Sequence, residues 1–486
     1  MSSTQLFNLD TIAQQAMLEY GFIPSYPPAV MKETQAAAEP SFPISDFEAK
    51  DLRSLLWFSI DNDDSRDLDQ LTYAETRPQG GYTIRIAVAC VDLLVKKDSA
   101  VDNRAANNTT SVYTPTKTFP MLPEKFSTDL TSLNPNEDRF AVIFEGNLSA
   151  DGTLEATSIY TAYVHNYAKL AYDAVSNWLD GKEKPEIVAS VKGLEEQVRL
   201  QDSIAHILAK LRHSQGALSL ETIEPHTVLD NGIPVAIDFM PKNRGRLLIE
   251  NFMIIANTIS AKYASNNNLA FLRRVVTVPR RWDKIIQVAQ EYGTQLPETP
   301  DSVALEKFLV KQRESNPVAF PDLSLTIIKL LGNGEYKVFV PGKSMPGHFG
   351  LALRDYTHST APNRRYPDLI VQRILLASLY KKELPYSQRD LENLASHCTK
   401  KEDEADKIER RMRKSAAALV LSNSIGKEYD CIVTGTGEKG TWVRVLNPPV
   451  EGKLVKGVES VDVGDRIRVK LVHTDVLQGF IDFVRV

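Results

Sequence analysis

Apolar and polar positions alternate along the first third of the chain in a way that predicts a β-sheet with an acidic loop at its edge. Residues 55–60 read LLWFSI, with the length and aromatic content of a buried strand. Residues 82–91 read YTIRIAVACV, whose β-branched residues predict a strand of the same sheet. Between them, residues 61–70 read DNDDSRDLDQ and contain five carboxylates. We therefore expect these acids on a loop at the end of a strand, where a rigid scaffold presents functional side chains.

Other segments carry helical patterns. Before residue 50 we expect one short amphipathic helix, about 11–20, followed by a loop. That loop is punctuated by Pro24, Pro27, Pro28, Pro40 and Pro43. Further helices are expected at about 167–180 and 192–213, and a hairpin at Asn231-Gly232. Residues 247–257 are apolar nearly all round, which indicates a core helix.

The C-terminal third continues with helices and then changes to strands. Residues 369–380 are helical in pattern, and Ser387 to Asp390 form a capping box that opens a long helix ending near Gly426. Its portion 400–414 is densely charged and expected to face solvent. Five short strands follow, at 429–433, 441–446, 452–455, 466–472 and 480–484. Such spacing predicts a five-stranded OB barrel, in which Tyr429, Trp442, Phe480 and Phe483 are core residues, stacking platforms or a mixture.

These patterns predict an α+β protein in which a mixed β-sheet domain is surrounded by helices and followed by a barrel. We expect an N-terminal helical and proline-rich segment at 1–50, a central domain at 51–424 and the OB barrel at 425–486.

Composition narrows the class of protein only moderately. The chain has 486 residues, with 57 basic and 62 acidic side chains and a net charge of -5. That charge gives no global attraction to nucleic acid, although a local basic groove stays compatible with it. No apolar run is long enough to span a bilayer, and the N-terminus lacks a secretion signal. Cys90, Cys398 and Cys431 match no zinc spacing, so we expect a cytoplasmic protein without a membrane partner.

Three interpretations of the acidic loop follow from the residues. Two like charges about 4 Å apart repel by about 4 kcal/mol near a protein surface, so five converging acids would require cations. A charge run is usually a solvated turn, in which case no site exists. A calcium loop fails because its sixth position has Arg66 instead of Gly and its twelfth has Thr72 instead of Glu. A magnesium site remains compatible, because Mg²⁺ takes a few carboxylates and lets substrate phosphates complete its octahedron.

A second polar loop, residues 356–368, reads YTHSTAPNRRYPD. Pro367 suits the first position of the helix that follows, so Arg364 and Arg365 lie just before a helix N-terminus. Backbone donors and guanidinium groups at such a position both favour a phosphate. By itself, an arginine pair of this kind is more often a surface ion-pair partner.

The acidic loop, the arginine loop and the barrel occur in the order of a known family. Over residues 51–486 the chain resembles the ribonuclease II and ribonuclease R family of processive 3′ to 5′ exoribonucleases. The family loop Ile-Asp-x5-Asp-x-Asp-Asp is matched at residues 60–61 and 67–69, with Gln70 in place of the last Asp. The family's TSPIRRYxD appears as TAPNRRYPD at 360–368. Further similarity lies in residues 111–113, 121–123 and 168–173, in the Glu250 helix and in the barrel, which resembles an S1-type OB fold.

The resemblance implies a role for several residues. Asp61, Asp67 and Asp69, together with Gln70, would hold Mg²⁺, or Mn²⁺ in its place, at the scissile phosphate, and Arg364 would bind and polarise phosphates. Substrate-binding roles would fall to Tyr113, Tyr172, Arg365 and Glu402. The two tyrosines would contact the 3′-terminal nucleotides, where stacking is worth about 1–3 kcal/mol per base. Without the resemblance, Tyr172 would be interpreted as a core residue of an amphipathic helix.

The resemblance also implies a substrate and a product. A central channel would admit single-stranded RNA and exclude duplexes, 2′-hydroxyl contacts would distinguish RNA from DNA, and nucleoside 5′-monophosphates would leave. We expect a monomer, and the sequence identifies no protein partner.

Two departures from the family pattern matter. The family commonly carries two cold-shock-type OB domains ahead of the catalytic domain, and the roughly fifty residues present here are too few for one, so RNA capture would rely on the terminal barrel and the channel mouth. Gln70 removes a formal charge from a dication site, although its amide oxygen can coordinate, and Asp63 or Asp64 could supply the charge.

We favour an active enzyme. An RNA-binding protein that lost catalysis through Gln70 is the main alternative, and a DNA-directed nuclease is a third.

Overall fold

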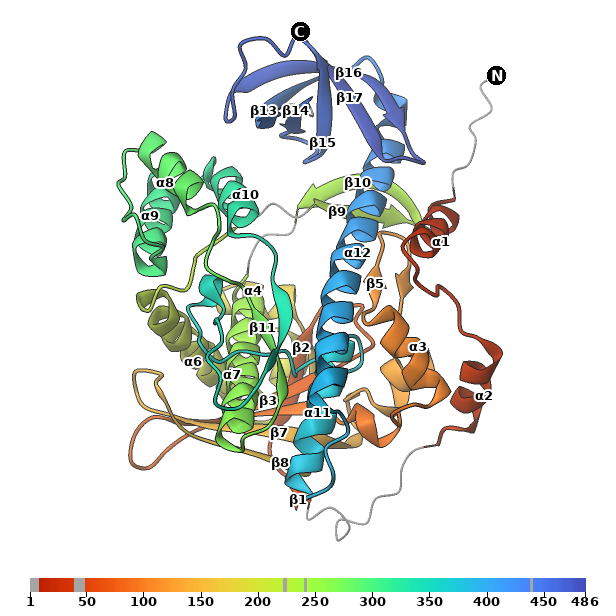
Figure 1. Cartoon of the computed structure of the whole chain (residues 1–486), viewed down its shortest axis with the longest axis vertical. Coiled ribbons are helices and arrows are strands. Elements are labelled where there is room, and N and C mark those ends of the chain that lie inside the picture. Colours follow the sequence, from red (N-terminus) through yellow and green to blue (C-terminus); the bar gives the residue numbers. More distant parts are fainter. Residues whose placement is uncertain (1–7, 39–48, 222–224, 240–242, 438–439) are drawn as a thin grey trace.

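The secondary structure alternates between helices and strands throughout the chain. A computed structural model describes residues 8–38, 49–221, 225–239, 243–437 and 440–486 (Figure 1). Its helices are α1 (Leu9–Glu19), α2 (Pro28–Ala36), α3 (Ala100–Asn108), α4 (Tyr172–Leu179), α5 (Glu186–Ser190), α6 (Leu194–Ser214), α7 (Arg244–Asn266), α8 (Trp282–Glu291), α9 (Ser302–Ser315), α10 (Phe320–Leu331), α11 (Tyr366–Leu379) and α12 (Gln388–Leu421). Its strands are β1 (Lys50–Asp51), β2 (Trp57–Asp61), β3 (Gln70–Thr76), β4 (Tyr82–Ala89), β5 (Val112–Tyr113), β6 (Thr118–Phe119), β7 (Asp138–Leu148), β8 (Leu154–Ala171), β9 (Pro225–Asp230), β10 (Ile233–Phe239), β11 (Phe271–Val275), β12 (Glu335–Phe339), β13 (Glu428–Gly437), β14 (Gly440–Val445), β15 (Glu451–Lys456), β16 (Arg466–Asp475) and β17 (Phe480–Arg485).

The sheet that carries the acidic loop has the strand order β1-β8-β2-β3-β4-β7, and β8 also pairs with β7. The long β8 therefore closes the sheet on itself, pairing antiparallel with β7 along its first part and parallel with β2 at its end. In that last part Ile60 lies opposite Leu170 and Asp61 opposite Ala171. Because parallel strands end at the same edge, the acidic loop and Tyr172 leave the sheet side by side.

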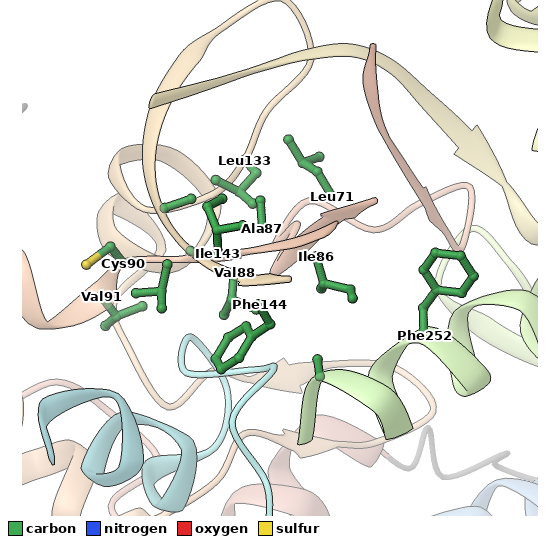
Figure 2. Packing of buried hydrophobic residues seen from close by; sticks show 14 of the residues in the cluster. Leu71, Ile86, Ala87, Val88, Cys90, Val91, Leu133, Ile143, Phe144 and Phe252 are labelled. Atoms are coloured by element: carbon green, nitrogen blue, oxygen red, sulfur yellow. The ribbon is translucent and has the colours of Figure 1, made fainter. Parts of the chain in front are cut away.

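A large apolar core fixes this sheet against α7 and α11. Trp57, Phe58 and Phe144 from the strands are almost fully buried, as is Phe252 from α7. Figure 2 shows Phe252 and Phe144 in the same layer as Ile86 and Val88. Burying each such aromatic side chain contributes about 1.5–3 kcal/mol relative to leaving it exposed. The strand ends that carry the loop are thereby held on a rigid base.

The long helix α12 connects the sheet region to the barrel (Figure 1). It packs against α1, β10, β12, β16 and β17. The prediction that its portion 400–414 faces solvent holds for only one face of the helix: Lys407 and Arg410 are exposed, whereas Ala405, Ile408 and Met412 are buried. Lys401 is buried as well, and its Nζ donates to the carbonyl oxygens of Tyr20 and Gly21 at 2.8 and 3.0 Å. A densely charged helix can thus bury one face, including a lysine, when neighbouring elements supply partners.

The C-terminal strands form a closed barrel in the order β13-β14-β15-β17-β16, as predicted. Its aromatic residues divide between core and surface: Phe483 is fully buried, whereas Phe480 is 56% exposed. Tyr429 packs edge-on against Phe483. The α+β fold class and the barrel are confirmed.

Several local predictions need correction. The helix expected at 167–180 begins only at Tyr172, because residues 167–171 complete β8 with its alternating burial. The N-terminal segment contains a second helix, α2, which Pro28 opens at its first position; Pro40 and Pro43 lie outside the described residues. Helix α11 begins at Tyr366, so Pro367 is its second residue. Residues 112–113, within the segment that resembles the family, form the short hairpin β5–β6 with residues 118–119. In the described ranges, no helix has the length and apolarity needed to cross a membrane.

Candidate active site

The acidic loop is held by side chains from neighbouring elements. Lys169 on β8 donates from Nζ to the carbonyl oxygens of Asp63 and Ser65, at 2.7 and 2.6 Å. Asp61 ends β2, and its Oδ1 accepts from the Ser65 hydroxyl at 2.9 Å and the Asn62 amide at 2.7 Å. The Ser132 hydroxyl accepts from the Leu68 amide at 2.9 Å. These contacts make the loop an ordered structure and not a solvated turn, although Asp63 and Asp64 themselves are exposed.

The two polar loops meet at the ion pair between Asp69 and Arg364. The Nε–H of Arg364 donates to Asp69 Oδ2 at 2.9 Å, and the Asn363 amide donates to Oδ1 at 3.3 Å. The Asp69 side chain is 3% exposed, whereas that of Arg364 is 38% exposed. Arg364 therefore neutralises a buried carboxylate and still faces open space.

Burial also changes the protonation of the loop acids. It raises the pKa of Asp69 to about 7, and Arg364 opposes that rise. Burial likewise raises the pKa of Asp67, with Asp61 and Asp64 adding to the rise and Arg364 opposing it. These carboxylates thus share one environment in which Arg364 only partly offsets the cost of burying negative charge, and a bound cation would supply further positive charge.

The arginine loop also positions Tyr113. The amides of Ser111 and Tyr366 donate to the carbonyl oxygens of Arg364 and Thr109, at 3.0 and 2.7 Å, which joins the segment before β5 to the arginine loop. The Tyr113 residue is 41% exposed, but burial raises the pKa of its hydroxyl to about 12, with Arg364 opposing and Asp67 adding to the rise. The ring is therefore open on one side while its oxygen lies among the site's charged groups. An exposed ring in this orientation can stack on a base.

Tyr172 reaches the same site from the end of β8. Burial raises the pKa of its hydroxyl; Asp61 adds to the rise, and Arg246 and Arg364 oppose it. The guanidinium carbon of Arg246, in the first turn of α7, lies 4.7 Å from the centroid of the Tyr172 ring. Arg246 also donates from Nη2 to Asn62 Oδ1 at 3.0 Å. The site thus gathers residues from the acidic loop, β8, α7 and the arginine loop.

Two of the residues assigned to substrate binding are engaged elsewhere. Arg365 donates from Nη2 to Asp368 Oδ1 at 2.7 Å, where Asp368 also accepts from the Ala361 amide and fixes the start of α11. Glu402 is paired with Arg274 of β11, and burial raises its pKa. Gln70 opens β3, is partly exposed, and pairs through its backbone position with Val88. Their proposed contacts with a ligand stay predictions.

The donor types around the acidic loop suit a hard divalent cation, which prefers oxygen ligands. Within the part of the chain that the structure describes, no three or more His, Cys, Asp or Glu side chains are arranged as a metal-binding group. One of the carboxylate oxygens expected to bind the cation, Asp69 Oδ2, accepts instead from Nε of Arg364. The residues therefore fit a cation in chemistry and in charge, and Asp69 would have to share its oxygens between the cation and Arg364.

Sequence reasoning missed two residues of this site. Arg246 lies at the start of an apolar helix, and nothing in its local pattern distinguishes it from a surface arginine. Glu409 lies in the charged portion of α12, where its Oε1 accepts from the Tyr113 amide at 2.9 Å. Only contacts between distant segments reveal either residue.

We expect Glu409→Ala to free the β5 backbone, because the Tyr113 amide loses its charged acceptor. Hydrogen exchange of a peptide containing Tyr113 should accelerate about tenfold, as expected for losing a hydrogen bond to a charged group. Glu409→Gln keeps a carbonyl acceptor and should accelerate exchange less. The matched control is Glu392→Ala, which changes an exposed residue of the same helix and should leave exchange at Tyr113 unchanged. If exchange at Tyr113 is also unchanged in Glu409→Ala, Glu409 does not hold the β5 backbone.

Comparison with known proteins bears on the whole chain. The RNB domain family matches residues 49–381, and the RNase II-type exonuclease C-terminal S1 domain matches residues 427–486. Ribonuclease R 1 of Lactococcus lactis is 26% identical over 502 aligned positions, covering 96% of this chain but only 60% of that protein. The chain therefore spans less than two thirds of the length of this relative.

Solved structures share the fold. Mycoplasma genitalium RNase R, in complex with ribose methylated single-stranded RNA, superposes with a TM-score of 0.89 at 23% identity, covering 98% of this chain and 78% of that one. Yeast Ssd1, described as a pseudonuclease, superposes with a TM-score of 0.73 at 17% identity, covering 92% of this chain and 56% of that one. The resemblance drawn from the motifs is confirmed, and the chain belongs to the RNB domain family.

Proposed function

We propose that the chain is a divalent-metal-dependent 3′ to 5′ exoribonuclease that shortens single-stranded RNA and releases nucleoside 5′-monophosphates. The observation that carries this proposal is the Asp69–Arg364 ion pair, which joins the acidic loop to the arginine loop. It brings carboxylates, a partly exposed guanidinium and the open Tyr113 ring to one place. Phosphodiester hydrolysis needs metal ligands, a group that binds phosphate and a surface that holds a base.

The chain's own residues divide these tasks. Asp61, Asp67 and Asp69, with the amide oxygen of Gln70, would hold Mg²⁺ or Mn²⁺, which activates water and stabilises a leaving oxygen when bound. Asp69 accepts from Nε of Arg364, so the terminal guanidinium nitrogens stay available for non-bridging phosphate oxygens. Positive charge at that position stabilises the charge that builds up on the reacting phosphate.

The tyrosines would grip the 3′-terminal nucleotides without sequence preference. Every base has a flat face that can stack on an aromatic ring, so Tyr113 and Tyr172 would accept any nucleotide. Arg365 and Glu402 would contact the RNA from the edge of the site. Each is already paired with a protein side chain, Arg365 with Asp368 and Glu402 with Arg274.

A second candidate is an RNA-binding protein that retains the fold without catalysis. Gln70 favours it, because an amide contributes no formal charge to a dication site. The superposition with a pseudonuclease favours it as well, because it indicates that this fold is compatible with loss of nuclease activity.

We expect a 5′-labelled single-stranded RNA to be shortened progressively in the presence of Mg²⁺ and to stay intact with a chelator. Asp69→Asn should reduce the rate about 100-fold or more, since even outer partners of metal ligands are worth about 10- to 100-fold. Asp98→Asn, an exposed acid paired with Lys97, is the matched control and should retain the rate. RNA left intact by the wild type under all conditions would reject the nuclease, and consumption of an all-deoxy strand at the same rate would reject RNA specificity.

Gln70→Asp separates the two candidates. If the wild type is an active enzyme, restoring the carboxylate should change its rate by no more than about tenfold, the scale of one adjusted metal contact. An inactive wild type that binds RNA, and that gains hydrolysis in Gln70→Asp, would instead establish the RNA-binding protein. The same labelled RNA and gel assay measures both outcomes.

A further inference from the structure

Arg246 is a cation of the site that lacks a carboxylate partner. Arg364 is paired with Asp69, Arg365 with Asp368 and Arg212 with Glu250, whereas Arg246 forms no ion pair with any residue that the structure describes. Among the described residues, the one hydrogen bond that its guanidinium makes goes to the neutral side-chain oxygen of Asn62. A positive charge beside an acidic loop, with only a neutral partner, is suited to an anion from outside the protein.

The position of Arg246 restricts where that anion would lie. Its guanidinium carbon lies over the Tyr172 ring, 4.7 Å from the centroid, so the cation is held against an aromatic face. Its Nη2 points to the acidic loop through Asn62. Its Nε is buried and meets no acceptor among the described residues. A buried donor without a partner costs free energy, which an incoming acceptor would recover.

Neighbouring contacts fix the start of α7 in this place. The Asn243 side chain caps α7 by accepting from the Arg246 amide at 2.9 Å, and it donates to Asp173 Oδ1 at 2.7 Å. A Cβ added at Gly245 would lie 2.8 Å from the carbonyl oxygen of Tyr172, so the helix can approach α4 only with glycine at that position. In the sequence Asn-Arg-Gly-Arg at 243–246, the asparagine cap and the glycine contact therefore position the second arginine over the Tyr172 ring.

We propose that Arg246 is a substrate-binding residue that takes a non-bridging oxygen of the RNA phosphate next to the nucleotide held at Tyr172. This inference rests on the proposed function, because it takes single-stranded RNA as the ligand. Arg364 and Arg246 then bind the strand from two sides of the acidic loop, one beside Asp69 and the other beside Asn62. Tyr172 is kept in place by the guanidinium on its face.

The test measures binding of a single-stranded oligoadenylate to the full chain in the presence of a chelator, over a series of salt concentrations. Each phosphate contact to a single strand contributes about 0.7 to the slope of log affinity against log salt. Arg246→Gln should lower the magnitude of that slope by about 0.7, which weakens binding about fivefold at 0.1 M salt relative to 1 M salt. Arg246→Lys keeps the charge and should retain most of the slope.

Two controls distinguish a phosphate contact from a structural role. Asn62→Ala removes the loop acceptor but leaves the guanidinium, so its slope should equal that of the wild type. Arg199→Gln removes another arginine that lies 4.7 Å from an aromatic ring, that of Trp178, and is already paired with Glu195, so its slope should also be unchanged. A wild-type slope in Arg246→Gln, or a slope in Asn62→Ala as low as in Arg246→Gln, would overturn the proposal.

The outcomes also separate this proposal from the proposed function. RNA that is hydrolysed by the wild type, with no change of slope in Arg246→Gln, would reject the role of Arg246 alone. RNA that binds with the expected change of slope but is never cut would reject hydrolysis and support Arg246. Absence of any RNA binding by the wild type would overturn both.

Discussion

The ion pair between Asp69 and Arg364 is the contact on which the arrangement of the site depends. It joins the start of β3 to the loop before α11, two segments separated by almost 300 residues. A carboxylate as deeply buried as Asp69 is costly without a partner, and a guanidinium is the partner that can also present free donors to a ligand. Removing either side chain would leave an uncompensated charge at the centre of the site.

The strand order explains why the other groups arrive at the same place. Strands β2 and β8 run parallel and end together, so Asp61 and Tyr172 emerge at one edge. The buried aromatic core beneath them holds this edge rigidly. Helices α7 and α12 then add Arg246 and Glu409, the first by stacking on Tyr172 and the second by holding the Tyr113 backbone. The site is therefore built from a rigid sheet edge and from helices that orient its aromatic residues.

Much of this organisation could be predicted from local patterns. The buried strand before the acidic loop, the helix after the arginine loop and the five strands of the barrel all follow from periodicity and capping signals within short windows. The prediction from periodicity was wrong at residues 167–171, because their apolar spacing fits a strand and a helix equally well. These residues form a strand because they pair with β2. The burial of the charged portion of α12 was also beyond prediction, because it depends on partners such as the Tyr20 carbonyl that are distant in sequence.

Side-chain roles were harder to predict than elements. Arginine and glutamate are residue types that commonly bind ligands, but Arg365 and Glu402 are each paired with a protein side chain. Arg246 carried no signal in its local sequence, because its significance comes from a ring that lies on another element. Whether an arginine has free donors for a ligand depends on which of its nitrogens already meet a protein acceptor, and that requires the three-dimensional structure.

The proposed function requires the acids of the loop and Arg364 to form one cation-dependent phosphate site. Its most direct test is anomalous diffraction from crystals of the full chain soaked in Mn²⁺, which is a divalent ion of the expected ligand preference. We expect an anomalous peak within coordination distance of Asp61, Asp67 and Asp69 that is absent in crystals of Asp69→Asn. Ordered carboxylates without any peak between them, or a peak bound only elsewhere on the chain, would contradict it.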